Sequence, residues 1–213
     1  MNLKAVLKPA ACLALVAFGL HGLWPQTARR HPPGVLVGAE PEQHLIPEQP
    51  LGEVHGFTLS AVATYAVQAR VLHTKRYWAD AADLVPYDVA LGWGPMSDQA
   101  VLDQLRVAQS NRFFFYEWRE APPIPEKEIA CHAANNHLIA ASAEVAKIIR
   151  KLRAGQVVKL RGYLVNAVKP GGIRWATSLS RTDTGNGACE LFYVESAQVE
   201  DDSPPHDHRR LPH

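Results

Sequence analysis

The densest group of residues suited to binding chemistry is a basic stretch in the second half of the chain. It holds nine lysines and arginines and no aspartate or glutamate: Lys147, Arg150, Lys151, Arg153, Lys159, Arg161, Lys169, Arg174 and Arg181. The net charge of the whole chain is only +1, so the positive charge is concentrated here. Such a surface attracts an anionic partner, for example phospholipid head groups, nucleic acid or an acidic envelope polymer. The alternative is a solvated face with favourable charges at a helix end.

A catalytic alternative rests on Cys189 or Asp183. A cysteine nucleophile needs a neighbouring histidine, which His132 or His137 would have to supply, and a third group to orient it. Asp183 begins the Asp-Thr-Gly tripeptide of aspartic proteases, in which two such loops pair their carboxylates. No second copy occurs in this chain, so a glycine-rich hairpin turn explains the tripeptide better. A hydrolase-like enzyme using Cys189 or Asp183 is therefore the second hypothesis, and no catalytic residue is assigned.

The histidines and cysteines of the middle of the chain bear on metal and redox chemistry. His132 and His137 are five positions apart, which places them on opposite faces of a strand, so we expect no metal site and no cofactor. Cys131 and Cys189 are the two cysteines beyond the N-terminal apolar segment. An oxidising compartment would permit them to form a disulfide bond, and two separate thiols are the alternative.

The N-terminus predicts export or anchoring. Pro9 to Ala28 contains no charged residue and follows Lys4 and Lys8. Twenty helical residues reach about 30 Å, the thickness of a bilayer core. We expect an uncleaved signal anchor over 1–28, with a cleaved signal peptide as the alternative. The slight positive excess before the segment favours a membrane-anchored domain in the periplasm, and an exported soluble form is the alternative.

The remaining chain divides into a linker, one folded domain and a tail. Residues 29–56 contain five prolines and no sustained apolar period, which predicts an extended, weakly structured linker. Residues 57–199 hold the periodic apolar patterns of a single domain. Residues 200–213 are acidic and then rich in proline, histidine and arginine, and have too little apolar surface to fold.

Within the domain, apolar patterns predict strands over 57–77, 112–119, 128–140, 156–166 and 188–195. A further strand is expected around residues 173–179, with Ile173, Trp175 and Leu179 turned to the core. The aromatic strand over 112–119 is expected to be central in the sheet. Two short helices are expected, one capped by Ser97 and one from Ser142 to Arg153.

In the strand over 156–166, alternation turns Val158, Leu160 and Leu164 to the core, and turns Lys159, Arg161 and Tyr163 to solvent. We expect a bend at Gly162 and a meander of the last three strands. The predicted fold class is α+β, with an N-terminal membrane segment followed by one mixed domain. Its antiparallel sheet resembles a small barrel of the oligonucleotide/oligosaccharide-binding (OB) type.

Several segments also carry longer motifs: Leu91–Leu102 (LGWGPMSDQAVL), Ser110–Phe113 (SNRF), Asn136–Ile139 (NHLI), Gly155–Val165 (GQVVKLRGYLV) and Asp183–Glu190 (DTGNGACE). In these motifs the stretch from 60 to 195 resembles a family of uncharacterised proteobacterial membrane or exported proteins. The resemblance implies a bacterial cell-envelope setting and supports the domain bounds. It implies no activity and assigns no chemistry to any residue.

Overall fold

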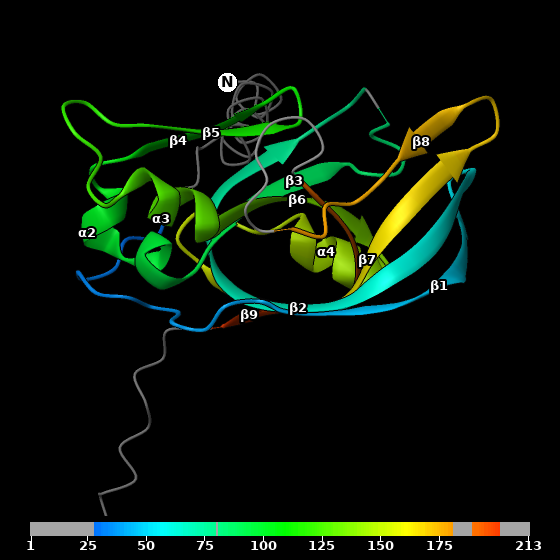
Figure 1. Ribbon diagram of the computed structural model, residues 1–213, viewed down its shortest axis with the longest axis horizontal. Helices are drawn as coiled ribbons and strands as arrows, with labels where there is room; N and C mark the ends of the chain where they lie inside the picture. The colour runs from blue at the N-terminus through cyan, green and yellow to red at the C-terminus, as the bar shows by residue number, and fades with distance from the viewer. Residues whose placement is uncertain (1–27, 80, 181–188, 201–213) are drawn as a thin grey trace, which may run out of the picture.

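A seven-stranded sheet dominates the computed structural model, which describes residues 28–79, 81–180 and 189–200 (Figure 1). Its strands follow the order β1 (Glu42–Val54), β2 (Phe57–Arg76), β3 (Tyr87–Gly92), β6 (Ala133–Ala140), β9 (Glu190–Glu200), β7 (Val157–Lys169) and β8 (Ile173–Trp175). A separate hairpin consists of β4 (Arg106–Ser110) and β5 (Phe113–Glu117). The short helices are η1 (Gly94–Ser97), α2 (Gln99–Leu102), α3 (Glu126–Cys131) and α4 (Ala143–Ile149).

The sheet is partly closed because the long strand β2 pairs along both edges. Arg70, for example, lies opposite Gly92 of β3 on one side and opposite Val157 of β7 on the other. The strand pairs are antiparallel except β6 with β9, which run parallel. The described part is therefore mixed α+β, as predicted; it is mostly sheet and has three short α-helices rather than two.

Two hydrophobic clusters use opposite faces of the same strands. Leu138, Leu164 and Phe192 belong to a large cluster together with Trp93. Their sequence neighbours Ile139, Val165 and Leu191 belong to a second cluster, which also contains Phe57 and Leu59. A register shift between Ala61 and Ala63 lets β2 contribute to both, because an extra residue changes which face its side chains occupy.

The predicted helix after Ser142 is confirmed as α4, although it is shorter than expected and ends at Ile149. Ser142 caps it by accepting a hydrogen bond from the Val145 N–H at 3.2 Å. Val145, Ile149 and Leu152 are buried in the large cluster. The cap and this apolar stripe are local signals, which is why the sequence was sufficient to place the helix.

The first predicted helix begins one residue later than expected. Asp98, not Ser97, caps α2, because its carboxylate accepts from the Ala100 N–H at 2.8 Å. The Ser97 hydroxyl instead accepts hydrogen bonds from the backbone N–H groups of Leu36 and Val37 at 3.1 Å. Ser97 therefore fixes the N-terminal segment rather than a helix.

Three strand predictions need correction. Residues 126–131 form helix α3 before β6, so the stretch 128–140 is not one strand. The aromatic strand β5 pairs only with β4 and is not central in the main sheet. The last three strands are not a meander, because β7 lies between β8 and β9, and Ile173 and Leu179 are exposed rather than inward.

The proline-rich stretch is more ordered than expected. Residues 42–54 form β1, which pairs with β2. Before it, the Arg29 N–H donates to the Ala154 carbonyl at 2.8 Å and the Gly94 N–H donates to the Val37 carbonyl at 2.7 Å. The prediction of a weakly structured linker is therefore wrong for these residues, whose backbone polar groups are bonded to the domain. We call residues 29–37 the strap.

The expected membrane anchor and C-terminal tail lie outside the described residues, apart from Ala28 and Glu200. Within the ranges that are described, no helix has both the length and the apolar character needed to cross a membrane.

Candidate functional site

The basic residues of α4 and its C-terminal end are at the surface. Lys147, Arg150 and Lys151 are exposed, whereas Val145 and Ile149 of the same helix are buried. The amphipathic pattern of α4 therefore directs its positive charges outward, as the sequence predicted.

The basic residues of β7 are partly as expected. Lys159 and Arg161 are exposed, and Val158, Leu160 and Leu164 are buried, so the predicted faces are correct. However, β9 brings a carboxylate that the local sequence does not reveal: Lys159 Nζ lies 2.5 Å from Glu200 Oε1. The charge of Lys159 is thus partly balanced within the domain.

Tyr163 does not stand beside these charges as a free aromatic. It is half-buried and packs against the second hydrophobic cluster. The predicted bend at Gly162 is confirmed by a register shift between β7 and β9 at this point. A β-carbon at Gly162 would lie 2.0 Å from the Tyr193 carbonyl oxygen, so only glycine allows the strands to approach this closely.

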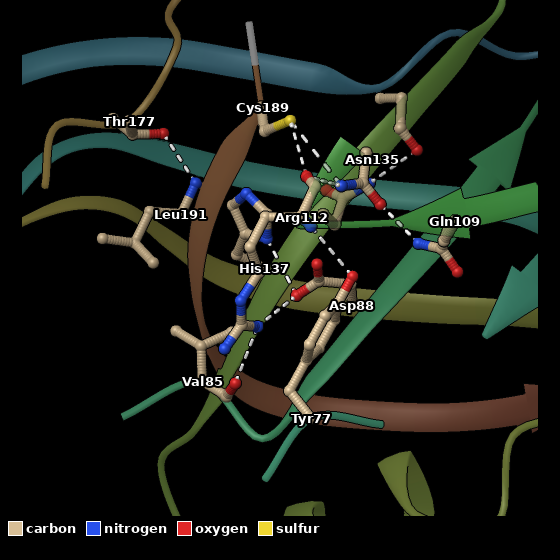
Figure 2. Close-up of polar contacts among 12 residues, drawn as sticks. Tyr77, Val85, Asp88, Gln109, Arg112, Asn135, His137, Thr177, Cys189 and Leu191 are labelled. Atoms are coloured by element: carbon tan, nitrogen blue, oxygen red, sulfur yellow. Dashed lines mark hydrogen bonds and ion pairs between the residues drawn. The ribbon is translucent and has the colours of Figure 1, made fainter. Parts of the chain in front are cut away.

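A buried polar cluster that the sequence did not predict joins β3, β6 and the turn of the β4–β5 hairpin (Figure 2). Its centre is Asp88, which has no exposed side-chain surface. One carboxylate oxygen, Oδ1, lies 2.9 Å from Nη1 of Arg112 and 2.8 Å from Nδ1 of His137. Asp88 and His137 are direct partners in the β3–β6 register. We call Asp88, Arg112, His137 and Tyr77 the Asp88 cluster.

Arg112 reaches Asp88 from the turn of the β4–β5 hairpin. Asn111 and Arg112 have φ angles of 49° and 68°, which fits the two-residue turn that joins Ser110 to Phe113. The Arg112 guanidinium also donates to the Val85 carbonyl at 2.9 Å. The side chain thereby fastens the hairpin to the loop before β3 as well as to the sheet.

Aromatic rings surround the side chains of Arg112 and His137. The Arg112 guanidinium carbon lies 3.8 Å from the centre of the Tyr77 ring, and the rings of His137 and Trp175 are 4.8 Å apart. Burial raises the pKa of the Tyr77 hydroxyl, although the Arg112 backbone N–H that bonds to this hydroxyl acts in the opposite direction. The carboxylate and the histidine are thus enclosed within the domain, and Arg112 links them to the hairpin.

The residues of the hydrolase hypothesis that the structure describes have the following neighbours. Cys189 Sγ lies 3.6 Å from Asn135 Nδ2 and 3.8 Å from the Arg112 carbonyl oxygen. His137, 3% exposed, lies against Asp88 instead. Asp183 lies outside the described residues.

Cys131 and Cys189 are not joined to each other by a disulfide bond in this structure. Across the described ranges, no group of three or more histidine, cysteine, aspartate or glutamate side chains is arranged to hold a metal ion.

One signal in the sequence pointed to the Asp88 cluster. Asp88 stands in the otherwise apolar run Leu84–Leu91 and is flanked by Tyr87 and Val89. A charge in a buried strand requires a partner, which makes a nearby cation or histidine a reasonable expectation. The identity of that partner depends on the β3–β6 register and on the hairpin, and neither can be read from local sequence.

Comparisons of the chain with models of protein families, with curated proteins and with solved structures find no match.

Proposed function

We propose that this chain is a non-enzymatic binding module, tethered to or exported across a bacterial membrane, that binds an anionic partner through the exposed basic residues of α4 and β7. The strand connectivity supports an OB-type architecture. Strands β2, β3 and β6, then α4, then β7 and β9 follow the chain order of that fold, and β2 pairs with both β3 and β7. OB folds serve mainly as binding platforms for oligonucleotides and oligosaccharides.

The observation that carries the proposal is a set of exposed and uncompensated positive charges. Lys147, Arg150, Lys151 and Arg161 are exposed, and none of the four forms an ion pair with a carboxylate among the described residues. Lys159, by contrast, forms an ion pair with Glu200 inside the domain. Charges without such partners are available to an external anion.

The usual ligand face of an OB fold is covered in this domain, which supports a different binding surface. That face lies on the second and third strands, here β3 and β6. Gln109 of the hairpin donates to Asn135 of β6, and Arg112 bonds to Asp88 of β3. Phe114 and Tyr116 of β5 pack against a third hydrophobic cluster, which contains Ala90 of β3. The hairpin thus occupies the surface on which a ligand would otherwise lie.

The test is retention of the domain on anionic vesicles and on heparin. Changing Lys147 and Lys151 together to glutamate is expected to weaken retention by more than about tenfold, because each basic residue near an anionic surface contributes about 1 kcal/mol. The matched control changes Lys127 and Arg119, two exposed basic residues elsewhere, to glutamate. Equal retention of both variants and the parent would contradict the proposal.

The tether has a separate test. If Pro9–Ala28 is buried in hydrocarbon, the full-length protein stays with membranes during alkaline carbonate extraction. Recovery of a form that begins near Arg29 would show cleavage and export instead.

A further inference from the structure

A pocket lies between the C-terminal end of α4 and the neighbouring ends of β2 and β3. Its volume is about 310 Å³, and its lining includes Thr74, Arg76, Tyr87, Arg150 and Arg153. Three arginine residues from two separate parts of the chain thus line one cavity. The two hydroxyl-bearing side chains add hydrogen-bonding capacity.

The charges of this pocket are not all used within the domain. Arg153 donates a hydrogen bond through Nη1 to the Leu152 carbonyl at 2.7 Å. It thereby helps to satisfy the backbone carbonyl groups that follow α4. Arg76 and Arg150 are exposed, and neither forms an ion pair with a described carboxylate. Two exposed arginines that line the cavity therefore have no balancing carboxylate from the described part of the chain.

Aromatic rings hold Arg76 in place. Its guanidinium carbon lies 3.5 Å from the centre of the Trp78 ring and 5.6 Å from that of Tyr87. A stacked guanidinium loses less conformational freedom when it binds an anion, because its position is already restricted. Trp78 itself is 78% exposed, which is unusual for so large an apolar ring and leaves it available to a ligand or a membrane interface.

From this geometry we infer that the pocket binds a phosphomonoester, with Arg76 and Arg150 as its bidentate partners. A phosphomonoester carries a charge of about −1.5 to −2 at neutral pH, which matches two guanidinium groups. Arginine pairs with phosphate through two parallel hydrogen bonds, which a lysine does not reproduce. The inference rests on the proposed function, because it identifies the chemistry of the anionic partner and its place. A lipid head group and a soluble metabolite both offer this group.

The experiment uses the full chain with two probes, glycerol 3-phosphate by calorimetry and phosphatidic acid vesicles by co-sedimentation. Phosphatidylglycerol vesicles of equal surface charge provide the phosphodiester comparison. The variants are Arg76→Gln/Arg150→Gln and the charge-preserving Arg150→Lys, and thermal melts establish that each is folded. Both arginines are exposed, so folding is expected to be unaffected.

We expect the glutamine variant to lose at least about tenfold in affinity for one or both probes, and Arg150→Lys to lose affinity despite its unchanged charge. Binding of glycerol 3-phosphate identifies a soluble ligand, and binding confined to phosphatidic acid identifies a lipid. Equal binding by parent and glutamine variant, or equal affinity for phosphatidic acid and phosphatidylglycerol, would overturn the inference. If either of these results is obtained but Lys147→Glu/Lys151→Glu still weakens retention on anionic surfaces, only the pocket is ruled out. The proposed function is then retained.

Discussion

Replacing Arg112 by alanine is the sharpest test of how the β4–β5 hairpin is held. The change removes the cation 2.9 Å from Asp88, the hydrogen bond to the Val85 carbonyl, and the contact with the Tyr77 ring. The Asp88 carboxylate has no exposed surface, so water cannot take the place of the guanidinium without local opening. Breaking a buried ion pair from one side typically costs about 3–5 kcal/mol.

A loss of that size is a large part of the free energy of unfolding of a domain, which is about 5–15 kcal/mol. At about 2–4 °C per kcal/mol for a domain of this length, the melting temperature is expected to fall by about 6–20 °C. Calorimetry or a circular-dichroism melt measures the shift. Hydrogen exchange of the amides of 106–117 should rise at the same time, because the hairpin loses its attachment.

Asp88→Asn/Arg112→Met is the companion variant. It removes both charges and keeps similar volumes, so it should recover a large part of the stability lost in Arg112→Ala. A loss below about 1 kcal/mol in Arg112→Ala, with unchanged exchange of the hairpin, would refute the assignment of Arg112 as its fastening residue.

Three further changes test local features. Ser142→Ala removes the cap of α4 and should cost about 1 kcal/mol in urea unfolding. Gly155→Ala places a β-carbon 1.9 Å from the Arg29 carbonyl oxygen at a φ of +89°, so it should cost about 1–3 kcal/mol and raise proteolysis of the strap. Hydrogen bonds from the Gly34 and Ala100 N–H groups lower the pKa of Asp98. The Asp98 carboxylate therefore stabilises the folded state fully above its pKa in the unfolded chain. This stabilisation is lost as the pH falls through the lower pKa of the folded state. The stability difference between Asp98→Asn and the parent should accordingly shrink below about pH 4, as urea unfolding across pH would measure.

Local signals account for the parts of the fold that were predicted correctly. The Ser142 cap with its apolar stripe, the alternation of β7 and the glycine at the bend each act within a few residues. Phe113–Glu117 shows the limit of such signals, because a strand with aromatic residues on both faces reads as central. In the structure one face packs on the third hydrophobic cluster, while Phe113 and Phe115 remain exposed.

The candidate sites depend on contacts that no local pattern encodes. The exposure of Lys147 and Lys151 follows from helical periodicity, so that part was predictable. The ion pair of Lys159 with Glu200 depends on the β7–β9 register. The pocket at Arg150 depends on Arg76, which comes from a strand far away in the sequence. Register and packing between distant strands are decided by the whole core rather than by any one segment.

The position of β9 has a consequence for how the chain folds. It is inserted between β6 and β7, and it is the last strand along the described chain. One edge of β2 likewise stays unpaired until β7 has been made, because Thr58 pairs with Val168. Sheets built from such distant partners fold on a timescale of about milliseconds to seconds. During synthesis β6 and β7 would present unpaired edges until residues 190–200 become available, and unpaired edges can associate with other chains. Newly made chains are therefore most prone to aggregation just before β9 becomes available for pairing.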